Sequence, residues 1–547
     1  MRDRCAHVPV YDYVIAGAGS AGCVLAARLS EDPDSNVLLL EAGPPDAAAE
    51  VSVPAATPSL WHGPFAWDDA TVPQARAAGR AIAWPHGRTL GGSSAINGMV
   101  YIRGNRADYD TWADRYGCTG WDYSGLLPYF RRAEDQQRGS SAFHGVGGPL
   151  RVEDPRFIHP LSRAWVASAI SAGLGANEDF NAASQDGVGF YQLNQREGRR
   201  WSAADAYLRP ALPRGNLTVK TGTLVTKILV EGTRAAGVRY LHDGTERVAR
   251  TSGEVLLCGG AVNSPRLLLL SGIGPAGHLR EYGIRVLADA PRVGDGLQDH
   301  PICLPEWHAP ATRNLWEEVG PEAMALWQRE GRGPMASSGA EAGGFARSRP
   351  DLAAPDLQFG LLPGPAPGPD MTPPDRRAAA AIVFAITPAS RGRVALRSAD
   401  PQATPLIDPA YLASEADLEL LVAGLRQARE VAACQPLAGL LAGESAPGEH
   451  VDGDALRMWV RRNLGTAFHP VSTCAMGSSA DAVCDPELRV RGVDGLRVVD
   501  ASVMPAAPRG NTNAPTIAIA ERAADLIRGN TPLAPAHAQS AEQDTGV

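Results

Sequence analysis

The sequence predicts an α/β protein, α+β overall, in which a Rossmann-like, doubly wound domain is combined with a second domain of sheet and helix. One observation is a strand–glycine–helix–strand pattern over residues 11–43. Another is that related units return at 254–275 and 495–527, far along the chain. The region from about 302 to 470 lacks this pattern, so we assign it to the second domain.

Size and composition limit the possible classes of protein. A chain of 547 residues exceeds one ordinary core, and 44% hydrophobic with 20% charged residues is typical of a soluble globular protein. The net charge of −9 argues against nucleic acid or an anionic membrane as the main partner. No run of about 18 apolar residues predicts a membrane span, and no signal-peptide pattern precedes the fold, so we expect a cytoplasmic protein.

The eight cysteines form no C-x-x-C pair, and no Cys/His cluster has metal-ligand spacing. We therefore expect no metal site and a reducing compartment. A disulfide is left open by the sequence, with Cys474 and Cys484 as the pair to check.

The N-terminal unit carries a dinucleotide-binding fingerprint. Residues 11–16 are predicted to form a buried strand, and Gly17, Gly19 and Gly22 follow in G-x-G-x-x-G spacing before a helix over about 21–30. The first glycine allows a tight turn, the second lets the backbone approach a pyrophosphate, and the third lets the helix pack on the strand. The N-terminus of the helix would face the phosphates.

A second strand over residues 36–40 ends in Glu41, where an acid is expected to accept hydrogen bonds from a ribose diol. The carboxylate would repel a 2′-phosphate, which argues against an NADP-type nucleotide. The fingerprint alone leaves both NAD and FAD open.

Later segments offer further ligand-facing positions. The loop at 87–104 is rich in glycine and serine and offers backbone N–H groups to a planar ring or a phosphate. Two or three strands are predicted over 217–240. Near the C-terminus a strand ends in Asp500, and a helix over about 516–527 follows. The middle region adds further strands and an amphipathic helix that begins at Ser414.

Two histidines are candidates for catalysis. His300 follows Asp299, and a pair of this kind is more often structural than catalytic. His469 lies in the stretch GTAFHPVSTCAMG, where Pro470 restricts its backbone to an extended geometry that could aim the ring. Taken alone, His469 would be a core histidine with a hydrogen-bond partner, so its interpretation depends on the surrounding motifs.

Four blocks in order resemble the glucose–methanol–choline oxidoreductases, which are FAD-dependent alcohol oxidases and dehydrogenases. The blocks are the fingerprint with Glu41, GRTLGGSSAINGMVYIRG, GGAVNSPRLLLLSGIGP and the C-terminal FHPVSTCAMG with DASVMPAAPRGNTNAPT. The resemblance covers about residues 11–527 and is greatest to the choline-dehydrogenase-like and aliphatic or aryl alcohol dehydrogenase branch. It implies that the second domain holds a mainly antiparallel sheet covered by helices.

The resemblance also implies which residues act. His469 matches the active-site histidine of the family, which makes catalysis the favoured interpretation, and Asn513 matches the second active-site position. The implied contacts to FAD are Gly17, Gly19, Ser20, Ala21, Gly22, Glu41, Ala42, Arg88, Leu90, Gly91, Gly92, Ser93, Asn97, Gly98, Met99, Val100, Val225, Asp500, Ala501, Asn511 and Thr512.

Three positions depart from the family pattern. Ile96 stands where some members attach FAD covalently through a histidine, so we expect non-covalent, dissociable FAD. Gly296 replaces the usual asparagine of one turn, and Ala475 replaces a common arginine. Neither of these two changes removes a catalytic group.

The predicted domain division follows the blocks. The FAD-binding domain is assigned residues 8–155, 216–301 and 471–530, and the substrate domain residues 156–215 and 302–470. Residues 531–547 are polar and rich in proline and alanine, and we expect them to be a disordered tail.

The chemistry of alcohol oxidation explains this choice of residues. A hydroxyl proton and a hydride leave the same carbon, and flavin N5 takes the hydride. A neutral imidazole suits the proton, and an amide such as that of Asn513 can donate to the alkoxide without competing for it. We therefore expect oxidation of a CH–OH group, that of a primary alcohol, to a carbonyl with His469 as base. O2, a quinone or another acceptor would then reoxidise the flavin.

Four other interpretations compete with this one. An NAD-linked Rossmann dehydrogenase explains only residues 11–41. A hydroxynitrile lyase or a light-driven fatty-acid decarboxylase would keep FAD on the same scaffold. A hydrolase would need a G-x-S-x-G elbow, which is absent from the sequence. A non-catalytic FAD-binding module would not need His469 and Asn513. The sequence leaves open the alcohol (choline-like, aliphatic, aryl, polyol or aminosugar), the choice between oxidase and dehydrogenase, and the oligomeric state.

Overall fold

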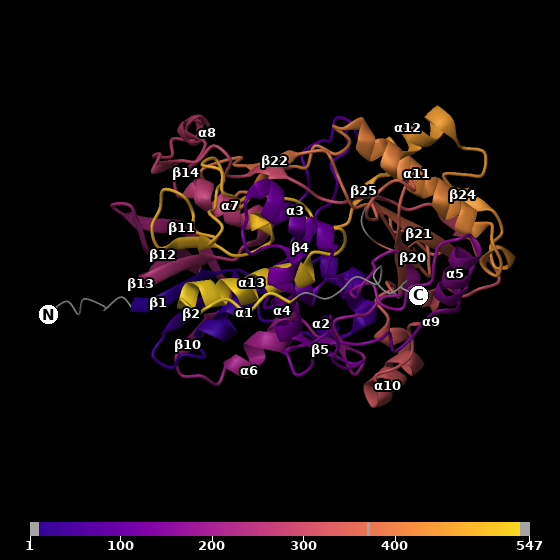
Figure 1. Cartoon of the computed structure of the whole chain (residues 1–547), viewed down its shortest axis with the longest axis horizontal. Helices are drawn as coiled ribbons and strands as arrows, with labels where there is room; N and C mark the ends of the chain where they lie inside the picture. The colour runs from indigo at the N-terminus through magenta and orange to yellow at the C-terminus, as the bar shows by residue number, and fades with distance from the viewer. Residues whose placement is uncertain (1–9, 369–371, 373, 537–547) are drawn as a thin grey trace, which may run out of the picture.

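Two large sheets organise the chain, one on each side of the molecule in Figure 1. The computed structural model describes residues 10–368, 372 and 374–536. The first sheet contains the N-terminal, middle and C-terminal strands, and the second is built from the central part of the chain. The predicted α/β class, with one doubly wound sheet and one antiparallel sheet, is therefore confirmed.

The first sheet is parallel where it carries the fingerprint. β1 (Val10–Ala16) pairs in parallel with β2 (Val37–Leu40) and β13 (Thr245–Leu257), and β10 (Leu217–Lys220) extends the sheet beyond β2. β26 (Leu496–Val498) pairs in parallel with the end of β13. The other half of β13 pairs with β12 (Arg234–His242), which pairs with β11 (Thr223–Glu231), and both pairings are antiparallel.

Helices from both ends of the chain cover this sheet. α1 (Ser20–Leu29) packs against α13 (Asn513–Arg528), which also packs on α4 (Tyr123–Ala133). α7 (Gly260–Leu270) follows β13 directly. α13 begins at residue 513, three residues before the predicted start, because the Thr516 N–H already donates to the Thr512 carbonyl and closes the first helical turn. Pro515 is tolerated in that turn because its missing N–H would have no helical partner there.

The second sheet is antiparallel throughout. Its main path runs β24 (Glu444–Ala446), β18 (Glu306–His308), β21 (Ala378–Ala385), β20 (Leu357–Leu362), β19 (Ala342–Ala346) and β7 (Gly187–Phe190). β17 (Pro301–Cys303) joins β21 to β25 (Gly465–Thr466). These pairings place the residues just before β17 beside those just after β25, although they are far apart in sequence.

Helices cover the second sheet as predicted. α11 (Glu415–Ala432) packs on β21, and its apolar face of Leu418, Leu421, Val422 and Leu425 is buried. α5 (Pro160–Ser171) packs on α11, β19 and β7, and α12 (Gly453–Asn463) packs on the outer side of α11. Gly424 is required at this interface, because a Cβ there would lie 2.4 Å from Val383 Cγ1.

Shorter elements complete the structure. They are α2 (Ala49–Ser52), η1 (Pro54–Trp61), β3 (Ala66–Trp67), β4 (His86–Gly87), η2 (Gly92–Ala95), α3 (Arg106–Tyr116), β5 (Glu134–Gln136), β6 (Leu150–Val152), β8 (Gln195–Arg196), β9 (Arg199–Arg200), η3 (Ala204–Leu208), α6 (Arg209–Ala211), β14 (Ile273–Gly274), α8 (Ala276–Glu281), β15 (Ala288–Asp289), β16 (Asp295–Leu297), α9 (Leu315–Glu318), α10 (Pro321–Glu330), η4 (Pro334–Ala336), β22 (Gly392–Ala395), β23 (Leu406–Asp408), η5 (Leu437–Gly439) and η6 (Ala501–Val503).

The C-terminal segment is only partly described. Residues 531–536 form no helix or strand, but the Leu533 N–H donates to Tyr129 Oη and the Ala536 N–H to the Ser124 carbonyl. The start of the predicted tail is therefore held against α4. The rest of the tail, 537–547, lies outside the described residues. The domain boundaries stay predictions.

Two further features bear on sequence expectations. The seven described cysteines are all free thiols, so Cys474 and Cys484 do not form a disulfide. No helix within the described ranges is long and apolar enough to span a membrane.

Candidate active site

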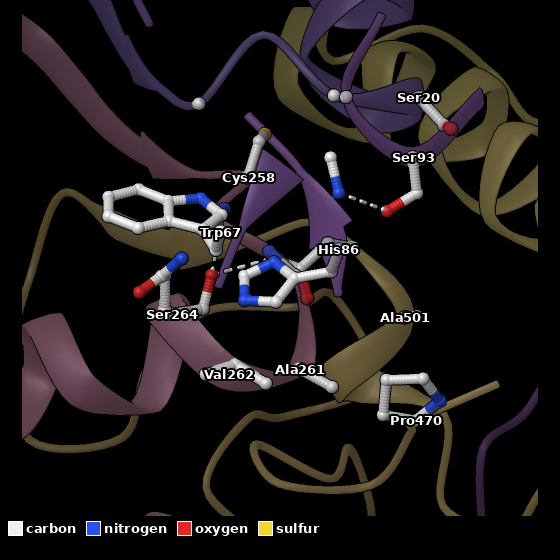
Figure 2. A pocket seen from close by; sticks show the side chains of 18 of the residues that line it. Ser20, Trp67, His86, Ser93, Cys258, Ala261, Val262, Ser264, Pro470 and Ala501 are labelled. Carbon is white, nitrogen blue, oxygen red and sulfur yellow. Dashed lines mark hydrogen bonds between the residues drawn. The ribbon is translucent and has the colours of Figure 1, made fainter. Parts of the chain in front are cut away.

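A cavity lies where the strands of the first sheet end, and it collects residues from the whole chain. It encloses about 1910 Å³ including its open mouth, and residues 92–94, 96–100, 467–470 and 511–513 line it together with the ends of β1, β2 and β13. Ser20 and Ser93 face it from the N-terminal part of the chain, and Pro470 and Ala501 from the C-terminal part (Figure 2). The cavity therefore brings residues of all four sequence blocks together.

The three glycines of the fingerprint have different structural roles. A Cβ on Gly22 would lie 1.9 Å from the Gly17 carbonyl oxygen, so helix and strand require glycine there to pack. Gly17 has φ +106°, which only glycine adopts readily. A Cβ on Gly19 would have the Cys258 carbonyl oxygen as its nearest neighbour, 3.9 Å away. No protein atom therefore excludes a side chain at Gly19, and the space next to the Gly19 backbone is part of the cavity.

This difference gives a prediction for two matched substitutions. Gly19→Ala is expected to leave the fold intact and to weaken dinucleotide binding, because the added methyl group enters only the cavity. Gly22→Ala is expected to destabilise the folded protein by several kcal/mol, on the order of an overpacked core. Thermal unfolding without added cofactor and titration with FAD separate the two effects. Equal losses of stability in both variants would contradict this division.

Glu41 lies at the end of β2, as predicted. Its Oε2 accepts from the Ala18 N–H at 2.8 Å and its Oε1 from the Gly43 N–H at 2.9 Å. Burial raises the pKa of this carboxyl, while the two backbone donors act in the opposite direction. Each oxygen retains acceptor capacity, so the carboxylate can still receive hydroxyl donors from the cavity.

Asp500 joins two ligand-facing turns. Its Oδ2 accepts from the Gly260 N–H at 2.9 Å and from Ser264 Oγ at 2.5 Å, and its Oδ1 accepts from Ser502. The carboxylate thus fixes the start of α7 against η6. Four protein hydrogen bonds engage this group, so its main contribution is to shape the wall that Ala501 completes.

Most of the predicted cofactor residues line the cavity. They are Gly17, Gly19, Ser20, Ala21, Glu41, Ala42, Gly92, Ser93, Asn97, Gly98, Met99, Val100, Val225, Asp500, Ala501, Asn511 and Thr512.

Four predicted contacts stand behind the wall. Gly22 packs on Gly17, Leu90 is part of the core, and the Gly91 N–H donates to the Ala18 carbonyl. The Arg88 guanidinium lies 4.9 Å from the centre of the Trp67 ring. These residues support the cofactor-facing segments and do not line the cavity themselves.

His469 is buried in the cavity wall, with 7% of its surface exposed. Its backbone N–H donates to Asp299 Oδ1 at 2.7 Å. Its Nδ1 lies 3.0 Å from His300 Nδ1, and its Nε2 lies 3.1 Å from Asn511 Nδ2. Every polar atom of this ring therefore has a partner, which fixes the ring's orientation before any substrate arrives.

The amide beside His469 is that of Asn511, whereas Asn513 lies farther along the wall. Asn513 accepts from Ser20 Oγ at 2.7 Å and donates to Asn194 Oδ1 at 3.3 Å. The structural reason is that residue 513 is the first residue of α13 and faces the fingerprint, whereas residue 511 is still in the preceding loop. The catalytic role of Asn513 stays a prediction, and the geometry favours Asn511 for that role.

A chain of hydrogen bonds determines which nitrogen of His469 carries the proton. Tyr191 donates its hydroxyl proton to the Phe359 carbonyl, so its oxygen accepts from Gln358 Nε2. The same amide nitrogen donates to Asn511 Oδ1 at 3.2 Å, which turns Asn511 Nδ2 toward His469 Nε2.

An amide nitrogen only donates, so His469 Nε2 must be the nitrogen with the free electron pair. The proton of His469 then lies on Nδ1 and is donated to His300. A neutral imidazole with Nε2 facing the cavity is the form that can accept a proton from an alcohol.

Asp299 and His300 hold this arrangement from behind. Asp299 Oδ2 accepts from Thr466 Oγ1 at 2.6 Å and from the Tyr411 hydroxyl, and burial raises its pKa to about 6. His300 is fully buried, and its Nε2 has no hydrogen-bond partner among the described residues. A structural role is the one that the sequence favours for this pair, and the structure places the pair in direct contact with the candidate base.

Burial lowers the pKa of both histidines. The pKa of His469 falls from its usual 6.5 to about 3, because the charged imidazolium is poorly solvated at this site. The pKa of His300 also lies well below its usual value, through burial and then through the neighbouring ring of His469. His469 is therefore neutral at physiological pH.

Aromatic residues outside the predicted catalytic and cofactor-binding set form much of the remaining wall. Trp61 and Phe468, which line the same cavity as His469, have their ring centres 6.0 Å apart, and Trp61 Nε1 donates to the Ile96 carbonyl at 3.1 Å. Trp67 and His86 stack with centres 6.0 Å apart (Figure 2). Phe468 could have been inferred from its place next to His469, but Trp61 lies in a segment without a recognisable pattern.

The residues present fit the FAD that the sequence resemblance implies. The cavity offers an open glycine backbone at Gly19, a carboxylate at Glu41, and a second region near residues 92–100. Ile96 holds no nitrogen or sulfur in its side chain that could attach a flavin. Within the described residues no group of three His, Cys, Asp or Glu side chains could hold a metal ion.

Comparison with known proteins agrees with this geometry. The two family models for GMC oxidoreductases match residues 11–302 and 388–520. The chain is 44% identical to mitochondrial choline dehydrogenase of Homo sapiens, over 96% of this chain and 90% of that protein. It is 41% identical to alcohol dehydrogenase [acceptor] of Pseudomonas putida, over 95% of this chain and 96% of that protein.

A solved structure extends the comparison to three dimensions. Pyridoxine 4-oxidase from Mesorbium loti superposes with a TM-score of 0.88 at 35% identity, covering 95% of this chain and all of that one. A match of this extent takes in both sheets. The chain therefore belongs to the GMC oxidoreductase family and is an FAD-dependent oxidoreductase.

Proposed function

We propose that this protein oxidises an alcohol to a carbonyl compound, with His469 as the base and Asn511 as the amide that holds the substrate oxygen. The observation that carries this proposal is the contact between His469 Nε2 and Asn511 Nδ2, at 3.1 Å, in the cavity that also holds the dinucleotide fingerprint. FAD, when bound, supplies the acceptor for the two electrons.

The two side chains divide the work on the hydroxyl group. His469 Nε2 accepts the proton, while its Nδ1–H continues to donate to His300. Asn511 Nδ2 donates to the oxygen on which negative charge develops. The substrate hydroxyl takes the place of the Asn511 N–H at His469 Nε2. Gln358 holds the oxygen of the Asn511 amide, so its nitrogen stays on the cavity side and can donate to the substrate oxygen as charge develops there.

The cavity wall favours an uncharged alcohol with an apolar or aryl group. Trp61 and Phe468 line the same cavity as His469, with their ring centres 6.0 Å apart. Of the described residues that line the cavity, only Glu41 and Asp500 carry carboxylates. Both carboxylates hydrogen-bond the fingerprint and α7 turns, and neither is a hydrogen-bond partner of His469 or Asn511. The wall beside His469 therefore presents no carboxylate to pair with a substituted ammonium group. An aromatic wall alone still attracts a cation weakly, so choline belongs in the test as a competitor.

The test is anaerobic mixing of the FAD-loaded protein with single alcohols while the flavin absorbance is followed. Benzyl alcohol and hexanol are expected to bleach the flavin more efficiently than choline does. Bleaching by choline alone would overturn the substrate proposal but not the reaction. A flavin that no alcohol bleaches in the dark would contradict alcohol oxidation and would favour a lyase or light-driven decarboxylase. Repeating turnover with O2 and with a quinone analogue identifies the electron acceptor.

The pH dependence of the reaction is a further prediction. Only neutral His469 can accept the proton, and burial lowers its pKa to about 3. Activity should therefore be present above the folded pKa and be lost only as the pH falls toward it. The rate of flavin reduction is expected to stay level as the pH falls from about 8 to about 6.5, across the upper part of the usual histidine range. Asp299, whose pKa burial raises to about 6, titrates only below this interval. A decline centred near the usual histidine pKa would show that the histidine is solvated in the loaded enzyme.

A further inference from the structure

A buried arginine without a carboxylate partner lies directly behind the cavity wall. Arg200, from β9, has only 2% of its surface exposed. Its Nη1 donates to the Asn97 carbonyl at 2.6 Å, to Asn97 Oδ1 at 2.9 Å and to the Ser94 carbonyl at 3.4 Å. Asn97 and Ser94 both line the cavity, so the guanidinium lies one residue away from it.

The other contacts of Arg200 are also neutral. Its Nε donates to the Val51 carbonyl at 3.0 Å and its Nη2 to Thr57 Oγ1 at 2.7 Å. The carboxylate that acts on its charge is that of Asp205, which is already bound to Ser202 and Arg209. Each nitrogen of the guanidinium therefore donates at least one hydrogen bond, but no counter-ion is in contact with it among the described residues.

The other buried arginines of the described residues fall into two groups. Arg266 and Arg522, 6% and 8% exposed, have no carboxylate in contact, and Arg200 is the least exposed of the three arginines of this kind. The remaining two are paired. Arg103, which is 1% exposed, pairs with Glu134 at 2.8 Å, and Arg497, which is 5% exposed, pairs with Glu254 at 2.7 Å. Burying an unpaired charge is costly, so the positions where it occurs invite a functional explanation. Burial lowers the pKa of Arg200 to about 9, which still leaves it positively charged at neutral pH.

The loop that Arg200 contacts, residues 94–99, has a strained backbone, and several of its carbonyl oxygens accept hydrogen bonds from side chains. Met99 has φ +64°, an unusual value for a residue with a side chain, and its N–H donates to Asn97 Oδ1 at 3.0 Å. The Ile96 carbonyl accepts from Trp61, and the carbonyls of Ser94 and Asn97 accept from Arg200. The same guanidinium thus fixes the loop and brings a positive charge to the cavity.

The geometry points to Arg200 as a positioning residue that also acts electrostatically: it shapes the loop at 94–97 and supplies the positive charge that favours the reduced, more negative form of the bound FAD. This inference rests on the proposed function, since it concerns the flavin that accepts electrons from the alcohol. It explains why the cation is buried without a carboxylate, because a protein counter-ion would cancel its effect on the ligand.

The test separates charge from shape with two matched pairs of variants. Arg200→Lys keeps the charge and loses the planar fork, whereas Arg200→Gln loses the charge. Thr57→Asp places a carboxylate against the intact guanidinium, whereas Thr57→Asn offers a neutral group of similar size. The readouts are the midpoint potential of the bound FAD and the affinity for sulfite, which adds to the flavin and leaves negative charge on the ring. Retention of FAD on gel filtration is measured in parallel.

We expect Arg200→Gln and Thr57→Asp to lower the potential and to weaken sulfite binding by about tenfold, the order of effect of one charge acting through a partly buried medium. Arg200→Lys and Thr57→Asn should stay much closer to the parent protein. If Arg200→Gln does not retain FAD, the Thr57 pair alone decides the question.

Two results would overturn the inference. One is an unchanged potential and sulfite affinity in Thr57→Asp. The other is an equal loss in the charged and neutral members of each pair, which would show that only the shape of the loop matters. The proposed function is tested separately, on the parent protein. If the parent protein binds FAD and oxidises an alcohol, the proposed function stands whichever result the variants give. If the parent protein cannot be loaded with FAD, the proposed function itself is contradicted.

Discussion

Replacing His469 by alanine is expected to slow the reduction of bound FAD by an alcohol by about 10²–10⁴-fold, the usual contribution of a general base. The ring is the group whose unprotonated nitrogen, Nε2, faces the cavity beside the Asn511 amide. Removing it leaves no neighbouring base in contact with that amide to accept the hydroxyl proton. Stopped-flow absorbance under anaerobic conditions measures the step directly.

Controls distinguish this loss from damage to the fold. His450→Ala changes an exposed histidine and should leave the rate unchanged. His469→Gln keeps a polar side chain without a base and should be as slow as the alanine variant, with a similar FAD content. Added imidazole should restore part of the rate in His469→Ala, because it fits the space that the ring leaves. A His469→Ala variant that reduces its flavin at the normal rate would remove His469 from the mechanism.

The fold could be predicted where the signals are local. The fingerprint places a strand, three glycines, a helix and an acid within residues 11–41, and each physical requirement acts between near neighbours. The structure shows this most clearly at Gly22, whose missing Cβ is required by Gly17, five residues earlier. The amphipathic face of α11 was predictable for the same reason, because a helix of period 3.6 displays its buried residues in the sequence.

The candidate site was predictable only in part, because its key contacts join residues that lie far apart in the chain. His300 and His469 come into contact because β17 pairs with β25, and no pattern in the sequence predicts that pairing. Arg200 reaches Asn97 across 103 positions and has no motif of its own. The choice between Asn511 and Asn513 depends on where a helix begins, and helix boundaries are the least certain part of any sequence interpretation.

The second large effect on flavin reduction is expected from substitution of Asn511, with Asn513 as its comparison. Asn511→Ala is expected to slow flavin reduction by about 10²–10³-fold, the usual loss on removing one donor to a developing oxyanion. Asn513→Ala should leave the reduction step close to normal and weaken FAD binding instead, since its side chain contacts Ser20 of the fingerprint. The expected pattern is a fall in rate with FAD retained for one variant, and a fall in FAD content with the rate per bound flavin retained for the other.

The reverse pattern would support the sequence-based assignment of Asn513. Asn511→Asp sharpens the comparison, because a carboxylate has nearly the same shape but accepts where the amide donates. It should reduce the rate at least as much as alanine does, since a negative charge beside the substrate oxygen opposes the charge that develops there. It should also raise the pKa of His469, so that the acid limb of the pH–rate profile moves to higher pH.

A Gln358→Leu variant should also slow flavin reduction, but by a smaller factor than Asn511→Ala, because it leaves the Asn511 amide present but free to turn away from His469.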